Sequence, residues 1–451
     1  MKFLSMDRRL MENFSWPLIF STLALIAIGL LNLYSVTLTS GSSEFYKQLC
    51  FFGVGLVLSF FVIFCDYGVL KKIAIPLYIL GILLLVMVEF MGIKAGGATR
   101  WLQIGGIRFQ PSEFVKPLLV ILLAAHFSRK EFAKKGMTLL NFILPTIFVL
   151  IPVALILREP DLGTAGLIGL SALPMFLYIY ISRALKIAIV LVLSTLVLWV
   201  TVFDGLDFLV KKGVVHSYQL DRVLTHANPE DDYNGKGWQI TQSKRAIGSG
   251  QILGRGFHDG TQQKYGFLPA PKTDFAFAAL AEEWGFIGAM VVLTFFYILI
   301  YSALSIVRRS KDNFGKYLVL GLASLIFWQM AINIAMVTGI FPVVGIPLPF
   351  VSYGGTSMLV SMLAVATICN VGMRRYLFQD DPVTQNPKVW EERQTLVIRE
   401  KTPLVRRLGP FNPHEPDVFP SWRLSHVKPW LKHLGHRTHR DYPQEPYDDN
   451  G

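Results

Sequence analysis

Long hydrophobic runs alternate with short polar segments over the first 375 residues of the chain. Each run has about 20 residues, which is enough for an α-helix to cross roughly 30 Å of hydrocarbon. The runs lie at 16–38, 46–66, 73–92, 111–128, 138–157, 163–181, 184–203, 275–306, 316–340 and 354–373. The first run is too long for a signal peptide. The pattern therefore predicts an all-α polytopic membrane protein with ten transmembrane helices.

Composition and charge agree with this prediction. The chain has 451 residues, of which 52% are hydrophobic and 16% are charged, and its net charge is +12. The basic residues gather in alternate loops, whereas loops such as 38–45 and 342–355 hold few. Because cytoplasmic loops are enriched in Lys and Arg, we expect a multi-pass protein of the cytoplasmic (inner) membrane with both termini cytoplasmic.

Two segments stand apart from the helices. A large extracytoplasmic loop, about 204–274, lies between predicted helices 7 and 8, is rich in turn residues and is of a length that is often functional. The last segment, 376–451, is rich in proline and has balanced charge, so we expect a disordered cytoplasmic tail after a transmembrane domain at 1–375. Partner binding by this tail, or metal binding by its stretch HLGHRTHR (433–440), stays open.

Three clusters place ionisable residues at membrane depth, where they are costly and often functional. Glu113 and Lys116 are three residues apart and share a helix face, either as a structural pair or as the lining of a polar cavity. Asp161, in EPDLGTA (159–165), can cap the next helix. No motif for a P-loop, a metalloprotease zinc site or a dinucleotide site is present, and the three cysteines lie in or beside apolar runs.

The third cluster is FLPAPKTDFAFAALAEEWGFIG (267–288). Asp274 lies at the start of a predicted helix, where a carboxylate is a favourable cap, so capping and a functional role both stay open. Glu282 and Glu283 lie about two turns deeper, beyond the reach of a cap, and are expected to hold polar parts of the bundle together. Basic residues on the same side, including Arg100, Arg222 and Arg245, suit a substrate with an anionic head group and a lipid tail.

Several long motifs, in order, resemble those of the SEDS family (shape, elongation, division and sporulation), and within it the RodA branch. They are GATRWLQIGGIRFQPSEFVK (97–116), EPDLGTA (159–165), WQITQSKRAIGSG (238–250), GRGFHDGTQQKYGFLP (254–269), TDFAF (273–277), AEEWGFIG (281–288) and GIFPVVGIPLPFVSYGGTS (339–357). The chain departs from the family's LPExHTDFIF pattern, because Ala270 and Lys272 stand where Glu and His are usual.

The resemblance implies a peptidoglycan glycosyltransferase that polymerises lipid II at the outer face of the membrane, beside a class B penicillin-binding protein and other elongation-complex membrane proteins. The family's essential aspartate matches Asp274, which we expect to be the general base for the acceptor hydroxyl. Lys116, Arg222 and Arg245 are candidates to support the departing undecaprenyl diphosphate, and direct displacement predicts inversion.

Other roles are given to the remaining candidates. Glu113, with Lys116, and Asp161 would shape the substrate cavity. No motif binds a cofactor, but a divalent cation, Mg²⁺ or Mn²⁺, could assist at the diphosphate. Gly354 and Gly355 allow a close backbone approach or break the helix before span ten.

The alternative functions are a lipid-linked precursor flippase, which needs polarity across the whole membrane, and a scaffold for cell-wall proteins.

Overall fold

The computed structural model describes residues 14–40, 43–95, 98–104, 107–129, 139–159, 161–178, 236–310 and 312–374. Its helices are α2 (Trp16–Ser40), α3 (Glu44–Phe64), α4 (Gly68–Lys72), α5 (Ala74–Met91), α6 (Pro111–Phe127), α8 (Leu139–Arg158), α9 (Leu162–Tyr178), α13 (Lys236–Ser249), α14 (Thr261–Lys264), α15 (Ala276–Arg309), α16 (Asn313–Val337) and α17 (Gly355–Met373).

Helices stand at nine of the ten predicted spans, with bounds that agree to within about four residues. The seventh span, 184–203, lies outside the described residues, as do the tail 376–451 and Arg222. Seven of the described helices are long and apolar enough to cross a membrane, and α6 and α9 have 17 residues each. Chain segments this apolar fold as helices because hydrocarbon offers no partner for an unpaired backbone N–H or C=O group. The all-α membrane fold is thus confirmed.

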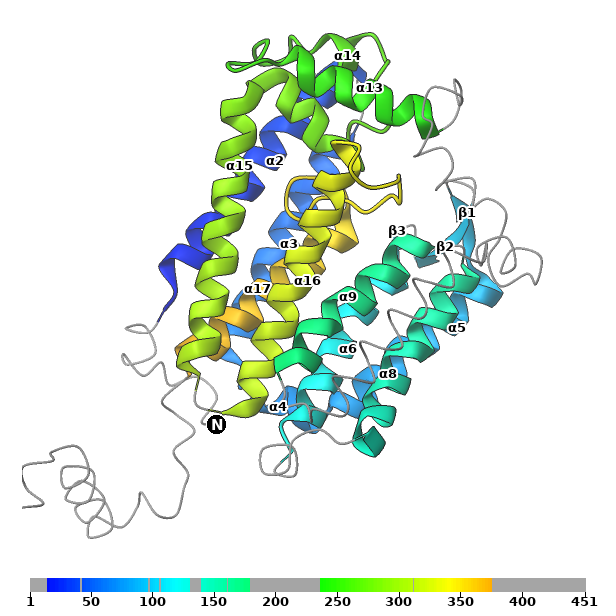
Figure 1. Cartoon of the computed structure of the whole chain (residues 1–451), viewed down its shortest axis with the longest axis vertical. Helices are drawn as coiled ribbons and strands as arrows, with labels where there is room; N and C mark the ends of the chain where they lie inside the picture. The colour runs from blue at the N-terminus through cyan, green and yellow to red at the C-terminus, as the bar shows by residue number, and fades with distance from the viewer. Residues whose placement is uncertain are drawn as a thin grey trace, which may run out of the picture. The chain divides into compact units, whose positions relative to one another are not determined.

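The long helices run side by side, as Figure 1 shows, with α13 and α14 at one end and α4 at the other. The helix α15 packs on α2 and α16, α16 also packs on α6 and α9, and α3 packs on α17. Their shared core includes the fully buried Leu25, Leu123, Phe296 and Ile368. We call the end that carries α13, α14 and the strands the sheet end, and the opposite end the α4 end.

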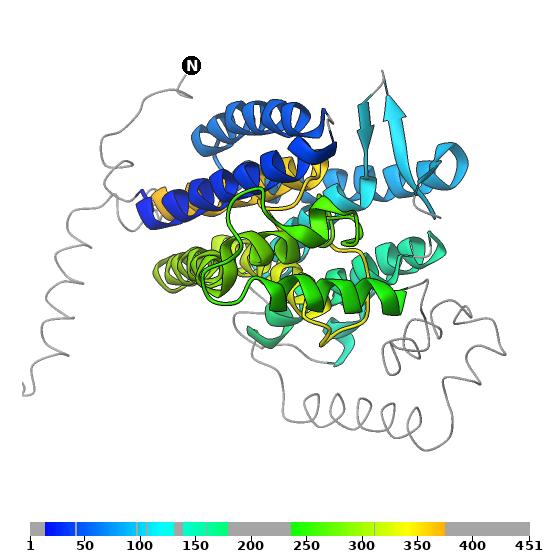
Figure 2. The same cartoon turned by 90° about the horizontal axis from the view of Figure 1, so that it is seen from above.

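A small antiparallel sheet between α5 and α6 was not predicted. Its strands are β1 (Ile93–Ala95), β2 (Ala98–Ile104) and β3 (Ile107–Phe109), in the order β1-β2-β3. Ile93 pairs with Trp101, and Leu102 pairs with Phe109. The strands β1 and β3 have only three residues each, and β2, ATRWLQI, does not alternate strictly between apolar and polar residues, so no period-two pattern indicates the sheet. Figure 2 shows this sheet beside the helix ends.

The described part of the extracytoplasmic loop is more regular than its turn-rich sequence indicates. The 14-residue helix α13 lies across the sheet end in Figure 2, and the buried Ser243 donates its hydroxyl to the carbonyl oxygen of Val337 at 2.7 Å. Val337 is the last residue of α16, so this bond satisfies a carbonyl that the helix itself leaves unpaired. The prediction of a turn-rich loop was therefore incomplete, because a helix of this length also fixes the loop to the bundle.

Helix α15 is kinked at Gly285, which has φ 67°. The loop segment 251–256 replaces the missing helical bonds at the kink. The N–H of Phe286 donates to the carbonyl of Gln251 at 2.9 Å, and the N–H of Gly256 donates to that of Glu283 at 3.0 Å. A Cβ atom at Gly254, whose φ is 82°, would lie 2.1 Å from the carbonyl oxygen of Glu283. Both glycines are needed, since positive φ and this close approach exclude other residues.

At the α4 end, the last turn of α17 closes the C-terminus of α3. The Asn370 amide donates to the carbonyl oxygens of Val62 and Cys65, at 2.5 and 2.6 Å. The Arg374 guanidinium donates to those of Ile63 and Phe64, at 3.0 and 2.6 Å. These are carbonyls that a helix end leaves without an internal partner, so the contacts fix α3 to α17. All three cysteines of the chain are free thiols.

Candidate functional site

The segment that carries Asp274 is held by its backbone from two helices. The Asn333 side chain on α16 donates its amide to the carbonyl oxygen of Asp274 at 2.9 Å. The Asn32 side chain on α2 donates to the carbonyl oxygen of Ala276 at 3.1 Å. Both asparagines are buried, so these bonds are protected from water and fix the chain on either side of Phe275, the residue at which α15 is capped.

The Asp274 carboxylate is not a helix cap. No side-chain hydrogen bond caps α15, and its cap residue is Phe275. The carboxylate is half-buried beside Gly345, where a Cβ atom would lie 3.5 Å from its Oδ2 atom. The structural alternative for Asp274 is therefore wrong, and the carboxylate is left available for other chemistry.

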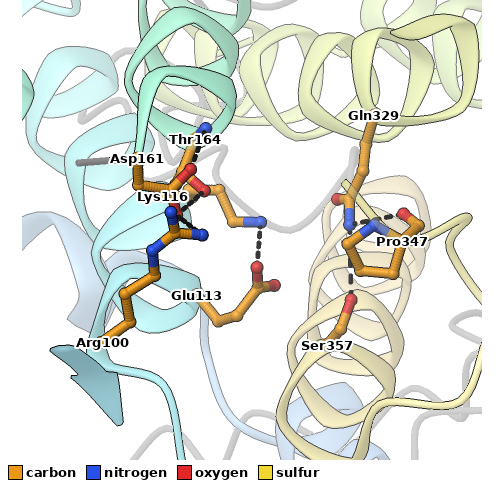
Figure 3. A network of polar contacts seen from close by, with 8 residues as sticks. All are labelled: Arg100, Glu113, Lys116, Asp161, Thr164, Gln329, Pro347 and Ser357. Carbon is orange, nitrogen blue, oxygen red and sulfur yellow. Dashed lines mark hydrogen bonds and ion pairs between the residues drawn. The ribbon is translucent and has the colours of Figure 1, made fainter. Parts of the chain in front are cut away.

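Asp161 joins a helix start to a strand, and Figure 3 shows this contact. Its Oδ1 atom accepts the backbone N–H of Thr164 at 3.1 Å, and its Oδ2 atom accepts the Thr164 hydroxyl at 2.9 Å, so the predicted cap of α9 is confirmed. The Arg100 guanidinium, on β2, lies 3.4 Å from Oδ2 of Asp161 and donates to the carbonyl oxygen of Glu159 at 3.3 Å. The strand thus delivers a cation to the carboxylates at this end.

Charge links this pair to Asp274. Burial raises the pKa of the Asp274 carboxyl, Arg100 opposes this rise in pKa, and Asp161 adds to it. Burial also raises the pKa of Glu159 to about 8, helped by Asp161 and opposed by Arg100. A carboxyl with a raised pKa is a stronger base once it is ionised, and perturbed carboxyls of this kind gather at functional sites. Asp274, Asp161 and Glu159 therefore form one electrostatic group around Arg100.

Glu113 and Lys116 form a buried ion pair on the first turns of α6. The Lys116 Nζ atom lies 2.7 Å from Oε1 of Glu113, and the two residues are 2% and 5% exposed. In Figure 3 this pair faces Gln329, whose amide donates at 3.3 Å to the Pro347 carbonyl oxygen and the Ser357 hydroxyl. The predicted pair is confirmed, but with its charge already taken by Glu113, Lys116 is a poor candidate to meet a diphosphate.

Glu282 and Glu283 bind the loop and α2 to α15. The Glu282 Oε1 atom accepts from the Thr261 hydroxyl at 3.1 Å and the Gln262 N–H at 2.9 Å. The Glu283 Oε1 atom accepts from the Ser35 hydroxyl at 2.5 Å. Both glutamates are at most 1% exposed. The prediction that they hold polar parts together is confirmed, although the parts include the loop as well as the helices.

The two remaining basic candidates receive less support. Arg245 is exposed on α13, and the contacts of the described residues do not join it to Asp274. Arg222 lies outside the described residues. Sequence reasoning named Arg100 only among the basic residues on this side and gave it no role of its own, although its place within the motif GATRW was a usable signal.

The suggestion that a divalent cation assists at the diphosphate stays a prediction. Among the described residues, no three His, Cys, Asp or Glu side chains come together in a way that could hold a metal ion. The Asp161 carboxylate already faces a cation, Arg100. What the arrangement offers is a carboxylate that can accept a proton, close to a guanidinium that can face an anion.

Comparison with known proteins agrees with the resemblance seen in the motifs. The model of a family described as cell cycle protein, which covers FtsW, RodA and SpoVE, matches residues 16–377. The chain is 37% identical to the peptidoglycan glycosyltransferase MrdB of Escherichia coli, over 78% of this chain and 93% of the relative. It is 33% identical to the probable peptidoglycan glycosyltransferase FtsW of Trichlorobacter lovleyi, over 80% of this chain and 93% of that one.

A solved structure has the same fold. It is described as "Structural coordination of polymerization and crosslinking by a peptidoglycan synthase complex". One chain of it superposes with a TM-score of 0.68 at 27% identity, covering 81% of this chain and 99% of that one.

Proposed function

Since this chain belongs to the cell cycle protein family of FtsW, RodA and SpoVE, we propose that it is a peptidoglycan glycosyltransferase that polymerises lipid II into glycan strands. The observation that carries the proposal is the position of Asp274. Its carboxylate is half-buried, does not cap a helix, and shares its electrostatic surroundings with Arg100 and Asp161. A base and a cation at one end of a membrane bundle suit a substrate whose sugars are in water while its lipid is in the bilayer.

In the proposed reaction Asp274 is the general base. The 4-hydroxyl of the acceptor GlcNAc attacks the anomeric carbon of the donor sugar, and the carboxylate of Asp274 takes the hydroxyl proton. The new C–O bond forms as the bond to the diphosphate oxygen breaks, and undecaprenyl diphosphate leaves with that electron pair. One displacement without a covalent intermediate inverts the anomeric carbon. A positioned base typically contributes about 10²- to 10⁴-fold to the rate.

Arg100 is the cation best placed to support the leaving diphosphate. Its side chain is 21% exposed and is oriented by Asp161 and the Glu159 carbonyl. A guanidinium can face phosphate oxygens with two parallel N–H donors, which gives both charge and direction. Arg100 therefore takes over the role that the sequence suggested for Lys116, while Glu113, Lys116 and Asp161 shape the surroundings.

We place the protein in cell elongation, with a class B penicillin-binding protein as its partner. The sequence of the segment GTQQKYGFLP (260–269) supports the RodA branch. The structural neighbour comes from a peptidoglycan synthase complex that couples polymerization to crosslinking. In this arrangement the sheet end faces the outside of the cell, and both termini are cytoplasmic.

The distribution of buried charge favours a polymerase over a flippase. A flippase needs a polar path through the whole membrane, whereas a polymerase needs polarity at one face. Among the described residues, the buried Asp, Glu and Lys side chains all lie near the sheet end: Glu113, Lys116, Glu159, Asp161, Glu282 and Glu283. This one-sided distribution of buried charged side chains supports the polymerase.

The test is polymerisation of purified lipid II by this protein with its penicillin-binding partner. Asp274→Asn, which keeps the shape but cannot accept the proton, is expected to make no detectable glycan strands. Asp259→Asn removes an exposed carboxylate from the same loop and serves as the matched control. Equal activity of the Asp274→Asn variant would remove Asp274 from catalysis. Lipid II crossing vesicle membranes, with no strands from any variant, would favour the flippase.

A further inference from the structure

The loop that carries Asp274 lies against the loop that leads into α17. The Tyr353 N–H donates to the carbonyl oxygen of Lys272 at 2.8 Å, which joins the two loops by their backbones. Lys272 is two residues before Asp274, so a shift of this contact is passed along less than about 7 Å of chain. The position of the carboxylate is therefore tied to the position of the loop before α17.

The first turns of α3 hold the loop before α17. The Gln48 amide nitrogen donates to the Ser352 carbonyl oxygen at 3.4 Å, and its amide oxygen accepts the Gly354 N–H at 3.2 Å. Gln48 is 2% exposed, so these bonds are shielded from water. A Cβ atom at Gly355 would lie 2.3 Å from the Phe51 ring, which shows how closely α3 meets the start of α17. Gly355 therefore serves close approach as well as the helix start.

An ion pair completes the contact. The Lys272 Nζ atom lies 3.4 Å from Oε2 of Glu44, the first residue of α3, and the two side chains are 23% and 29% exposed. Burial, and then the Glu44 carboxylate, raise the pKa of the Tyr353 phenol, so Tyr353 adjoins the same pair. The Lys272 ammonium thus faces the Glu44 carboxylate of α3, and the Lys272 backbone carbonyl accepts the N–H of Tyr353 before α17.

We propose that Lys272 is a positioning residue for the glycosyl transfer, whose ion pair with Glu44 holds the Asp274 loop against α3 and the loop before α17. This inference rests on the proposed function. A partly exposed ion pair adds little to the stability of a fold, so the main effect of this pair is on geometry. A displacement of about 1 Å in a reacting group can cost up to roughly 10²-fold in rate, so a weak contact at this place has a large effect on turnover.

The identity of residue 272 adds a consequence for pH. A histidine at this place would lose its charge near pH 6.5. The Lys272→His variant would therefore release the pair with Glu44 as the pH rises through that range.

The experiment compares four variants in lipid II polymerisation with the penicillin-binding partner. They are Lys272→Met, Glu44→Gln, the charge swap Lys272→Glu with Glu44→Lys, and Lys272→His. We expect the two single losses to lower kcat about tenfold with KM within about twofold, and the swap to restore most of it. Lys272→His should resemble the wild type at pH 6 and Lys272→Met at pH 8. Lys264→Met, an exposed lysine on α14, is the matched control.

A second measurement does not depend on activity. Hydrogen exchange at the Tyr353 amide, which donates to Lys272, should be faster in Lys272→Met and return to the wild-type rate in the swap. Unchanged kcat and unchanged exchange in the single variants would overturn the inference, and so would a swap that fails to restore either. If Asp274→Asn is inactive while these variants all match the wild type, the inference fails and the proposed function stands. If the wild type makes no strands, the proposed function fails, and unchanged exchange then overturns the inference as well.

Discussion

Asn333 holds the Asp274 carbonyl oxygen at 2.9 Å and, with the same amide nitrogen, the Ile346 carbonyl oxygen at 2.7 Å. One buried side chain thus fixes the backbone of the proposed base and the loop beside it. Asn333→Leu should lower kcat about 10- to 100-fold with little change in KM, because the base is displaced while the substrate contacts remain.

The control for this variant is Ser324→Ala on the same helix, which removes a buried hydroxyl that has no partner in the described structure. A loss of activity in both variants, with matching losses of folded protein, would indicate general damage to α16. A rise in KM with kcat unchanged in Asn333→Leu would place Asn333 in substrate binding and not in positioning.

The acid limb of the pH profile should report the pKa of Asp274. Burial raises this pKa, and a base must be ionised, so polymerisation should fall with decreasing pH at a value above that of an ordinary aspartate. Asp161→Asn removes a negative charge and should move the limb to lower pH, whereas Arg100→Gln removes a positive charge and should move it to higher pH.

These shifts are measured as kcat/KM against pH for the three proteins. Asparagine at position 161 can still accept the N–H of Thr164, so the start of α9 should be preserved. A limb that does not move in either variant would mean that a group other than Asp274 titrates in the profile.

Much of the fold could be predicted from the sequence, because hydrocarbon forces apolar runs into helices whose length is set by the bilayer. The ion pair of Glu113 with Lys116 and the cap at Asp161 were also predictable, since both depend on spacings of three residues within one element. The contacts of Asn333 and Asn32 with the segment 274–276 were not, because they join residues far apart in the sequence. Nor was the contact of Arg100 with Asp161, since it joins a strand to a helix start about 60 residues further along the chain.

Glu159 should make stability depend on pH. Burial raises its pKa to about 8 from an unfolded value near 4.5, so between these values the folded protein keeps a proton that the unfolded chain releases. Its contribution to stability is full below about pH 4.5 and is lost as the pH rises through about 8. Glu159→Gln is neutral at every pH, so it should raise the melting temperature by a few degrees at pH 9 and leave it unchanged at pH 4.

Thermal unfolding in one detergent at both pH values provides the measurement. Asp259→Asn, which removes an exposed carboxylate from the extracytoplasmic loop, is the control and should change little. A wild type whose melting temperature rises from pH 4 to pH 9 relative to the Glu159→Gln variant would contradict the prediction.

The buried pair on α6 should show strong coupling. Lys116→Met leaves the Glu113 carboxylate buried without its 2.7 Å partner, which typically costs about 3–5 kcal/mol. The double variant Glu113→Gln with Lys116→Met removes both charges and should recover most of that stability. The test is a double-mutant cycle of thermal stability, with polymerisation measured in parallel. A stable but inactive double variant would assign the pair to substrate binding, and a stable and active one would assign it to structure alone.

The attachments of α3 at its two ends limit how this helix can adapt to the thickness of the bilayer. Asn370 and Arg374 fix its carbonyls at the α4 end, and Glu44 and Gln48 fix it at the sheet end, while side chains such as Val57 and Phe61 between them are exposed. A helix that is held at both ends can bend but cannot slide or tilt freely. A thicker or thinner membrane would then bend α3 and displace Glu44 at its start. Because Glu44 pairs with Lys272, such a displacement would reach the segment that carries Asp274.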